Sequence, residues 1–593
     1  MESNSTESTS LERTPLESTE QLPHKLMVLI ALVQGFCLLY LHQAIELNYW
    51  PKEFPQWLFA FYSVALVLPV MLLLSLKPDN ISSIAKYTLP FAFLCGLLGF
   101  YVGYQATPIE YIRYDTLLFG YALTISLATF KALMYIQQLA VGERITYASL
   151  FRWSWRNYLT LFLSLVFAGS FWLILMLWAA LFKAININFF KELFEEPWFY
   201  YPAIALANGF GVIIFRRLSH IIDTITRLQQ ALMKFLLVLL VLVSVLFLCA
   251  LPFTGLAPLW ESGGSALILW MQALMLFFVN AVYQDTPDQR PYSLWLHRFI
   301  YFGVALLPIY SAISFYGLSL RVDQYGWSLS RCWAFLIWFL LALFPLGYWW
   351  GIAKKRDQWV IQLSRVNVVV GLIVLGMMIM INSPLLDFRK IVVGSQLERL
   401  ASEDVSVEDF DLHYFRHKLA RPGYEALQKL KEEYASSHPE IVVRIKELYR
   451  NRKIEKPAST KDEFIAALTV LADDVPSDLL EAIYENESKQ VWQLQNTKKY
   501  YLQALDLDED AQVDYLLAAQ RYNSIYLKLF YIDESAWIHI NLNTTGAGMN
   551  LKSQEAFIEA LKSGDIKFTR PRWNHLEIEG RKFQVNIEGN GRQ

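Results

Sequence analysis

Between Lys25 and Asp387 the sequence consists of apolar segments of membrane length, separated only by short polar breaks. The hydrocarbon core of a bilayer is about 30 Å thick, and roughly 20 helical residues cross it. Because lipid offers no hydrogen-bond partner to a backbone, each such segment must be helical. Eleven segments meet this criterion, at residues 26–45, 57–76, 88–105, 116–140, 158–182, 198–215, 232–253, 266–284, 299–318, 332–353 and 366–383. The sequence therefore predicts an α-helical polytopic membrane protein with about 11 transmembrane helices.

The distribution of polar residues divides the chain into four parts. Residues 1–24 are rich in Ser, Thr and Glu and are expected to be a disordered tail, and residues 25–383 form the transmembrane bundle. In 384–522 apolar residues recur every three or four positions, which predicts a helical region that ends with a helix over 510–521. Residues 523–593 alternate polar with apolar and are expected to form a small β-rich module with a hairpin near 576–587. The C-terminal part is thus a soluble α+β domain, mostly helical.

Positive charge predicts how the bundle is oriented. The even-numbered loops and the helix ends beside them hold 15 Lys and Arg residues, whereas the odd-numbered ones hold six. Loops rich in Lys and Arg stay in the cytoplasm. The even loops are therefore predicted to be cytoplasmic, together with the N-terminus. An odd number of crossings then places the C-terminal domain on the other side of the membrane.

Composition and motifs weigh against several classes of function. The net charge is −2, and no Lys/Arg-rich block is present, so a nucleic-acid partner is not expected. No G-x-S-x-G, phosphate-binding glycine loop or dinucleotide fingerprint occurs. These absences favour a protein that is not an enzyme, although they leave the question open, and no cofactor is predicted.

Two groups of motifs resemble a known family. The first comprises Leu251-Pro252-Phe253-Thr254-Gly255-Leu256 with Pro258-Leu259-Trp260, and Leu320-Arg321-Val322-x-Gln324-Tyr325-Gly326-Trp327-Ser328-x-x-Arg331. The second comprises Ser395-Gln396-Leu397-x-Arg399-Leu400, Asp409-Phe410-Asp411 and Pro422-Gly423-Tyr424-Glu425-Ala426-Leu427. Together they are similar to a family of bacterial multi-pass inner-membrane proteins that is catalogued as a domain of unknown function. The resemblance implies a bacterial inner membrane, with a periplasmic C-terminal portion under the topology above, and it supplies no catalytic residues.

Four polar residues in the predicted spans are candidates for a substrate or ion path: Lys131, Asn208, Gln272 and Asn280. An ammonium at membrane depth costs several kcal/mol unless it is paired or reaches the interface, so Lys131 either snorkels, has a structural partner or marks a site. The three amides either join helices by hydrogen bonds or line the path.

Two predicted outer loops carry the remaining candidates. Residues 251–265 contain several Pro and Gly residues with Trp260 and Glu261, and form either a plain loop or backbone that dips into a cavity. The other loop places Arg321 and Arg331 around Tyr325 and Trp327. These arginines either grip a lipid phosphate or anchor the C-terminal domain.

Metal binding has only a weak candidate. His413 and His417 lie four residues apart and would share a helix face with Asp409, but no Cys or third His is near in sequence. Asp506, Asp508 and Asp510 imitate the start of a calcium loop, which fails where Ala511 and Leu517 replace its Gly and Glu. No metal site is therefore predicted.

Two hypotheses about function follow. The first is a non-enzymatic envelope scaffold or adaptor, whose C-terminal domain meets an envelope protein while membrane lipids surround the bundle. The alternative is a transporter or lipid-handling protein that uses Lys131, Asn208, Gln272 and Asn280.

Overall fold

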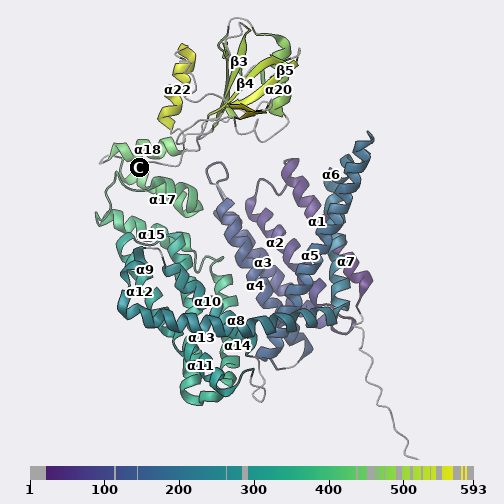
Figure 1. The fold of residues 1–593 in the computed structure, drawn as a ribbon, viewed down its shortest axis with the longest axis vertical. Coiled ribbons are helices and arrows are strands. Elements are labelled where there is room, and N and C mark those ends of the chain that lie inside the picture. Colours follow the sequence, from purple (N-terminus) through teal and green to yellow (C-terminus); the bar gives the residue numbers. More distant parts are fainter. Residues whose placement is uncertain are drawn as a thin grey trace, which may run out of the picture. The chain divides into compact units, whose positions relative to one another are not determined.

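The computed structural model describes residues 22–112, 115–142, 144–261, 264–283, 291–435, 438–449, 461, 464–465, 468–472, 475–488, 497–507, 512–521, 525–533, 536–542, 551–564, 566, 576–578 and 581–583. The chain forms two compact units, Met1–Tyr449 and Arg450–Gln593 (Figure 1). The first unit contains every apolar helix of membrane length among these residues. Each unit is described by itself below.

The first unit is a bundle of long apolar helices. Its helices are α1 (His24–Glu46), α2 (Pro55–Ser75), α3 (Ile81–Gln105), α4 (Asp115–Val141), α5 (Tyr147–Ala184), α6 (Phe189–Glu195), α7 (Pro197–Arg217), α8 (Ser219–Thr254), α9 (Ala257–Glu261), α10 (Ser265–Val282), α11 (Leu294–Ala305), α12 (Leu307–Tyr325), α13 (Leu329–Lys355) and α14 (Val360–Met380). Within the described residues, ten stretches are long and apolar enough to cross a membrane, and Ala266–Val282 is a shorter apolar helix. Each of the eleven predicted segments lies on one of the ten stretches or on the shorter helix. The ninth segment is divided between α11 and α12, with Pro308 in the first turn of α12. The prediction of a polytopic helical membrane protein is confirmed.

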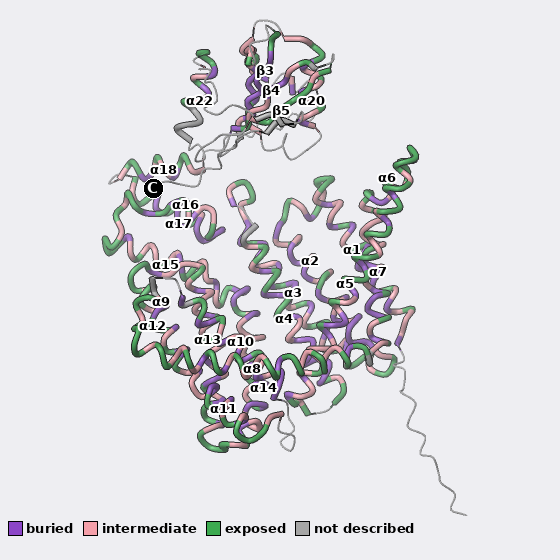
Figure 2. The backbone as a smooth tube through the Cα atoms, in the orientation of Figure 1, coloured by how far each residue is buried: buried purple, intermediate pink, exposed green. Residues whose placement is uncertain are grey.

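The outer faces of the helices are apolar. Buried positions lie where helices face one another, and exposed positions lie on their outer sides (Figure 2). Among the exposed side chains, Phe119 is 73% accessible, Trp295 77% and Phe253 90%. Water would penalise such a surface, whereas lipid accepts it. The bundle is therefore built to be covered by acyl chains.

Helix α8 lies at a steep angle to α1–α5 and runs across the bundle from the N-terminal helices toward α9 (Figure 1). Its 36 residues extend about 54 Å at 1.5 Å per residue. Since the apolar core of a bilayer is only about 30 Å thick, a helix of this length can cross while strongly tilted. Helix α8 continues through Pro252 to Thr254, and the helix break that the prolines and glycines of 251–265 predicted falls at Gly255, whose φ is +72° and which separates α8 from α9.

Small residues allow the closest contacts between helices. A Cβ atom on Gly103 would lie 2.4 Å from the carbonyl oxygen of Pro55, and one on Gly99 would lie 2.7 Å from that of Phe59. Both distances are shorter than van der Waals contact, so only glycine lets α3 pack against α2 in this way. The glycines that interrupt the third apolar segment thus mark a helix interface.

One arginine inside the bundle acts as a helix cap. Arg216, in the last turn of α7, is 3% exposed. Its Nη1 donates to the carbonyl oxygen of Leu73 (2.7 Å) and its Nη2 to that of Leu76 (2.8 Å). These are carbonyls at the end of α2, which have no partner within that helix. The guanidinium therefore satisfies the C-terminus of α2 and holds α7 beside it.

The two ends of the bundle are occupied by different parts of the chain. At one end, Arg217 of α7 contacts His24 at the start of α1. At the other end lie α15 (Phe388–Ala401), α16 (Leu412–Lys418), α17 (Ala420–Glu433) and α18 (Pro439–Tyr449), which we call the cap helices (Figure 1). Arg421 of α17 donates to Thr107 Oγ1 (2.8 Å) after α3, and Tyr414 Oη accepts from the Leu329 amide (2.9 Å) before α13. The start of α1 and the cap helices thus lie at opposite ends of the bundle.

The cap helices belong to the membrane unit. They share one apolar core with α13, to which Cys332 contributes together with Phe410, Phe415, Leu427 and Ile441. The structure divides the chain after Tyr449, whereas the sequence analysis placed boundaries after residues 383 and 522. The missing signal is tertiary, because the apolar stripe of α17 does not reveal that α13 lies within its core.

The second unit contains a five-stranded sheet. Its strands, in spatial order, are β1 (Leu468–Val470), β2 (Thr497–Leu505), β3 (Asp514–Arg521), β4 (Ile525–Asp533) and β5 (Ala536–Leu542). Strand β1 is parallel to β2, and the remaining pairs are antiparallel. The unit also contains α20 (Ser477–Ser488), α22 (Leu551–Ser563) and the antiparallel pair β6 (Leu576–Ile578) and β7 (Arg581–Phe583). The C-terminal α+β module is confirmed, as is a hairpin in its last part.

The helix predicted over 510–521 is wrong, because this segment contains strand β3. Tyr515 and Leu517 pack in the core that contains α20, while Leu516 and Ala518 pack in the core that contains α22. A strand buried on both faces is apolar throughout and shows no period of two. The Leu and Ala residues therefore looked like a helix until the neighbouring strands were known.

A buried ion pair fixes α20 to this sheet. Lys528 Nζ of β4 lies 2.5 Å from Glu487 Oε1, and the Glu487 side chain is 1% exposed. Asn486 Oδ1 accepts a second hydrogen bond from Lys528 (2.7 Å), and Tyr500 donates to Glu487 Oε2 (3.3 Å). The carboxylate is thus both paired and hydrogen-bonded, as its burial requires.

Replacing Gly103 with Leu tests the contact between α2 and α3. We expect Gly103→Leu to lower the free energy of unfolding by roughly 1–3 kcal/mol, because the added side chain would overlap the backbone of α2. The measurement is the thermal unfolding midpoint of the full chain in detergent. Gly169→Leu on α5 is the control, since a Cβ there meets no atom within 4 Å. Equal midpoints for the two variants would contradict the proposed packing.

Candidate functional site

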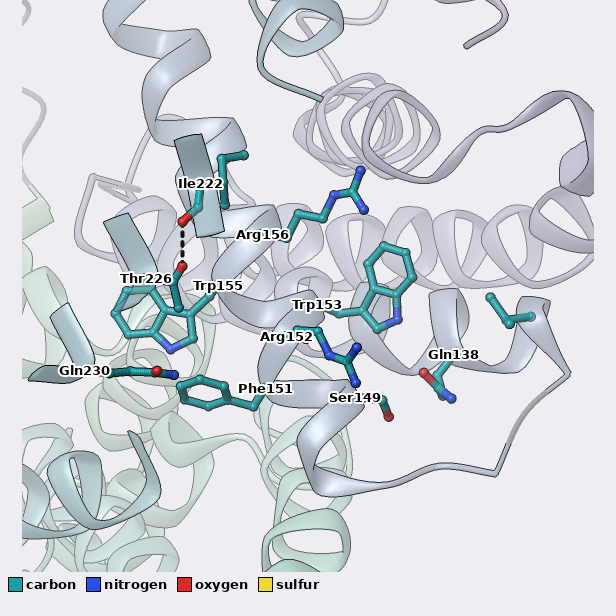
Figure 3. Close-up of a pocket in the computed structure, with 11 residues that line it drawn as sticks. Gln138, Ser149, Phe151, Arg152, Trp153, Trp155, Arg156, Ile222, Thr226 and Gln230 are labelled. Atoms are coloured by element: carbon teal, nitrogen blue, oxygen red, sulfur yellow. Dashed lines mark hydrogen bonds between the residues drawn. The ribbon is translucent and has the colours of Figure 1, made fainter. Parts of the chain in front are cut away.

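A pocket of about 270 Å³ lies where α4 ends and where α5 and α8 begin (Figure 3). Helix α5 supplies more than half of its lining, and α4 and α8 supply the rest. The lining residues are Gln138, Val141, Ser149, Phe151, Arg152, Trp153, Trp155, Arg156, Ile222, Thr226 and Gln230. Two of them are arginines, four carry amides or hydroxyls, and none is acidic. This pocket is the candidate functional site.

The first turn of α5 forms one edge of the pocket. Thr146 caps the helix, because its Oγ1 accepts a hydrogen bond from the Ser149 amide (3.3 Å). Ser149 Oγ in turn donates to the Thr146 carbonyl oxygen (2.8 Å). A helix start carries a partial positive charge from its free amides. The helix therefore adds to the positive potential of the arginines.

The arginines lie one turn apart on the same side of α5. Arg156 lies over the ring of Trp153, with its Cζ 5.8 Å from the ring centre. Arg152 is exposed, and its guanidinium lies between Ser149, Gln138 and Trp153 (Figure 3). Arg152 forms no hydrogen bond or ion pair with any residue that the structure describes. Arg152 is therefore available to bind an anion.

The floor of the pocket is rigid. Gln138 is 2% exposed and its Nε2 donates to the Arg144 carbonyl oxygen (3.2 Å). Below it, Trp153 packs against an apolar cluster that includes Met134 and Tyr135. The Arg152 backbone is therefore held by packed neighbours on both sides.

Sequence reasoning missed this site. Arg152 and Arg156 were counted as charges that set topology, and Trp153 and Trp155 fit an aromatic belt at the membrane interface. The run Arg152-Trp153-x-Trp155-Arg156 was the available signal. This run lines a pocket only because α8, about 70 residues later in the sequence, closes it.

The predicted path residues Asn208 and Gln272 each bond within the bundle. Ser164 of α5 donates to Asn208 Oδ1 (2.9 Å). Gln272 Nε2 donates to Ser311 Oγ (2.7 Å) and to the Leu341 carbonyl oxygen (3.2 Å). These are hydrogen bonds between helices, the alternative that the sequence analysis gave for them.

Asn280 is the centre of a larger polar cluster. Its Oδ1 accepts from Tyr348 Oη (2.8 Å) and from Asn367 Nδ2 (2.8 Å), and its carbonyl oxygen accepts from Tyr147 Oη (2.6 Å). Tyr348 also donates to Asn367 Oδ1. Four helices, α5, α10, α13 and α14, meet at this one amide. Asn280 therefore joins the N-terminal and C-terminal parts of the bundle.

Lys131 differs from these amides. It is partly buried in α4 and forms no hydrogen bond or ion pair with any described residue. Thr124 and Tyr135, on the same face of α4, bond to Asn382 (2.7 Å) and to the Val368 carbonyl oxygen (2.8 Å). Lys131 therefore lies on the face of α4 toward α14. No described hydrogen bond joins any two of Lys131, Asn208, Gln272 and Asn280, so the shared path stays a prediction.

The loop before α13 is held by α15. The Trp327 amide donates to Ser395 Oγ (3.0 Å), Gln396 Nε2 donates to the Trp327 carbonyl oxygen (2.7 Å), and Arg399 donates to that of Gln324 (3.2 Å). Gly326 has a φ of +67°, and a Cβ there would lie 2.6 Å from Arg399 Cδ. Two separate sequence motifs, residues 320–331 and 395–400, are thus the two halves of one contact.

The arginines of this loop have different environments. Arg331 Nη1 donates to the carbonyl oxygens of Gly326 (2.8 Å) and Tyr325 (3.3 Å), and its Cζ lies 5.3 Å from the centre of the Tyr325 ring. Arg331 thus bonds within its own loop, and both interpretations of the two arginines, a grip on a lipid phosphate and an anchor for the C-terminal domain, stay predictions. Arg321 is exposed near the end of α12 and forms no such contact with a described residue.

The remaining candidates show less. Trp260 and Glu261 end α9, and their side chains lie outside what the structure describes. The rings of His413 and His417 lie next to each other on α16, with centres 4.1 Å apart and planes tilted by 45°. Among described residues, no group of three or more His, Cys, Asp or Glu side chains could hold a metal.

A sequence model of one family, described as a domain of unknown function (DUF4153), matches residues 28–430. The match covers about two thirds of the chain. The chain belongs to this family. The DUF4153 region runs from α1 into α17, so it includes the bundle and most of the cap helices but ends before the five-stranded sheet. No curated protein and no solved structure matches the chain.

Replacing Gly326 with Val tests the contact between the loop and α15. A branched side chain at positive φ costs about 1–2 kcal/mol, and its atoms would also displace Arg399. We expect Gly326→Val to speed amide hydrogen exchange in α15 while α1–α5 exchange as in the wild type. Gly394→Val, on α15 itself, is the control because a Cβ there meets nothing within 4 Å. Unchanged exchange in Gly326→Val would contradict the contact.

Proposed function

We propose that this DUF4153 protein is a non-enzymatic scaffold of a bacterial inner membrane, which presents its C-terminal module on the periplasmic face to a partner in the envelope. The observation that carries the proposal is the fixed attachment of the cap helices. They contact the bundle on two sides, after α3 through Arg421 and before α13 through Trp327. If the cap helices only tethered the C-terminal module to the bundle, neither contact would be needed.

Charge supports the orientation in this proposal. The end of the bundle where α1 begins carries the loops rich in Lys and Arg, which the positive-inside rule assigns to the cytoplasm. The cap helices lie at the other end, on the loops that are poor in these residues. The module that follows Tyr449 would therefore emerge into the periplasm.

The use of polar groups inside the bundle also favours a scaffold. Asn208, Gln272 and Asn280 bond to neighbouring helices, and Arg216 caps one. Polar groups that are engaged with one another stabilise a single arrangement of helices. A transport path instead needs polar groups that are available to a substrate.

Fusions to an enzyme that is active only outside the cytoplasm test the orientation. We expect a fusion after Gln593 to be active, because eleven crossings carry that end to the periplasm. A fusion after Gln358, in a loop rich in Lys and Arg, is the control and should be inactive. The reverse pattern, with both fusions at normal abundance, would overturn the proposed location of the module and its partner.

The second candidate function, transport or lipid handling, rests on Lys131. Under the scaffold proposal its charge is not needed, so we expect Lys131→Met to complement a strain that lacks the gene as well as the wild type does. Lys86→Met, which alters an exposed lysine on α3, controls for loss of charge. Loss of complementation by Lys131→Met alone, at unchanged abundance in the membrane, would favour the second function.

A further inference from the structure

The pocket at the start of α5 has the properties of an anion site at the membrane interface. Its lining includes Arg152, Arg156 and the hydroxyl of Ser149 on one helix, and it includes no carboxylate. The structure points to a binding site for a phosphate ester, and we propose that Arg152 is its principal ligand. This inference does not depend on the scaffold function.

The donors suit phosphate in number and kind. A guanidinium presents paired N–H groups that match two phosphate oxygens, and such charge-assisted hydrogen bonds are stronger than neutral ones. Ser149 Oγ and the first turn of α5 lie beside Arg152 (Figure 3). This helix start contributes partial positive charge, but the Ser149 amide is capped by Thr146 Oγ1 and Ser149 Oγ donates to the Thr146 carbonyl oxygen, so Arg152 is the donor that a phosphate would use.

The size and walls of the pocket indicate what carries the phosphate. About 270 Å³ is near the lower limit of small-ligand sites, so it admits a headgroup and excludes a large cofactor. Phe151, Trp153 and Trp155 form apolar walls beside the charged groups. Rings of this type lie at the level of lipid headgroups, where one side is wet and the other apolar. A phospholipid headgroup fits both features, although a soluble phosphate ester shares the same chemistry.

Membrane topology alone also places arginines at this end of the bundle. A binding site differs from a charged loop because one particular arginine accounts for most of the affinity. Arg227 on α8 offers that comparison, because it is exposed at the same end of the bundle but does not line the pocket. If only bulk positive charge attracts lipid, the two arginines are equivalent. If the pocket is a site, Arg152 matters far more.

Binding to the purified full-length protein in neutral detergent tests the proposal. Native mass spectrometry would count bound molecules during titration with short-chain phosphatidylglycerol, with a neutral diacylglycerol of the same chain length, and with glycerol phosphate. We expect one phosphatidylglycerol to bind in preference to the diacylglycerol, and Arg152→Gln to weaken this binding roughly tenfold. Arg227→Gln should bind as the wild type does, and Arg152→Lys should bind more tightly than Arg152→Gln.

Each result decides the matter in one direction. Preference for phosphatidylglycerol that depends on Arg152 supports a lipid headgroup, and glycerol phosphate binding with the same dependence supports a soluble ester at the same site. Equal losses in Arg152→Gln and Arg227→Gln, or no loss in either, would overturn the proposal. Unfolding midpoints of all variants show whether Arg152→Gln still folds. If it does not, Arg152→Lys is compared with the wild type instead. Equal affinity for phosphatidylglycerol and for the neutral diacylglycerol in both proteins would refute the site.

Discussion

The constraint on which the rest of this structure depends is that lipid satisfies no hydrogen bond. Every polar group at membrane depth must find its partner within the protein or pay its full desolvation cost. The bundle meets this constraint in part with side chains that reach neighbouring helices, whereas Gln272 Oε1, Thr129 Oγ1 and Ser314 Oγ are buried without a partner among the described residues. Arg216 serves the open end of α2, Gln272 reaches α12 and α13, and Asn280 meets three other helices. The hydrogen bonds that satisfy these groups also fix which helices are neighbours.

The same constraint explains why the two segments 320–331 and 395–400 depend on each other. Helix α12 must end outside the lipid, where its last carbonyls and the following loop need partners. Ser395, Gln396 and Arg399 of α15 supply them, across about 70 residues of intervening helix. Gly326 is required because the chain turns with positive φ directly under these side chains. Residues 320–331 and 395–400 thus form one structural element.

The sequence predicted the membrane helices well because apolar length is a local property. Each of the eleven segments contains enough apolar residues to be recognised as a membrane helix without knowledge of its neighbours. Strand β3 and the pocket at α5 depended on contacts that no local pattern records. Leu516 and Leu517 pack in two different cores, and Arg152 lines a pocket only because residues of α8 close it. Likewise, the sequence showed that Asn280 was polar in a span but not that Tyr147, Tyr348 and Asn367 would converge on it.

The two ends of the bundle consequently differ in physical character. At the end where the cap helices lie, protein covers the loops, and arginines such as Arg331 and Arg421 bond to neighbouring backbone and side chains. At the opposite end, Arg216 bonds to the carbonyls that end α2 and Arg298 pairs with Asp357 (3.0 Å), whereas Arg152 faces a pocket with aromatic walls. Positive charge at a membrane surface is balanced either by protein groups or by the anions of the lipid. Arg152 is paired by no described residue, and it is therefore the charge at this end that lipid anions are proposed to balance.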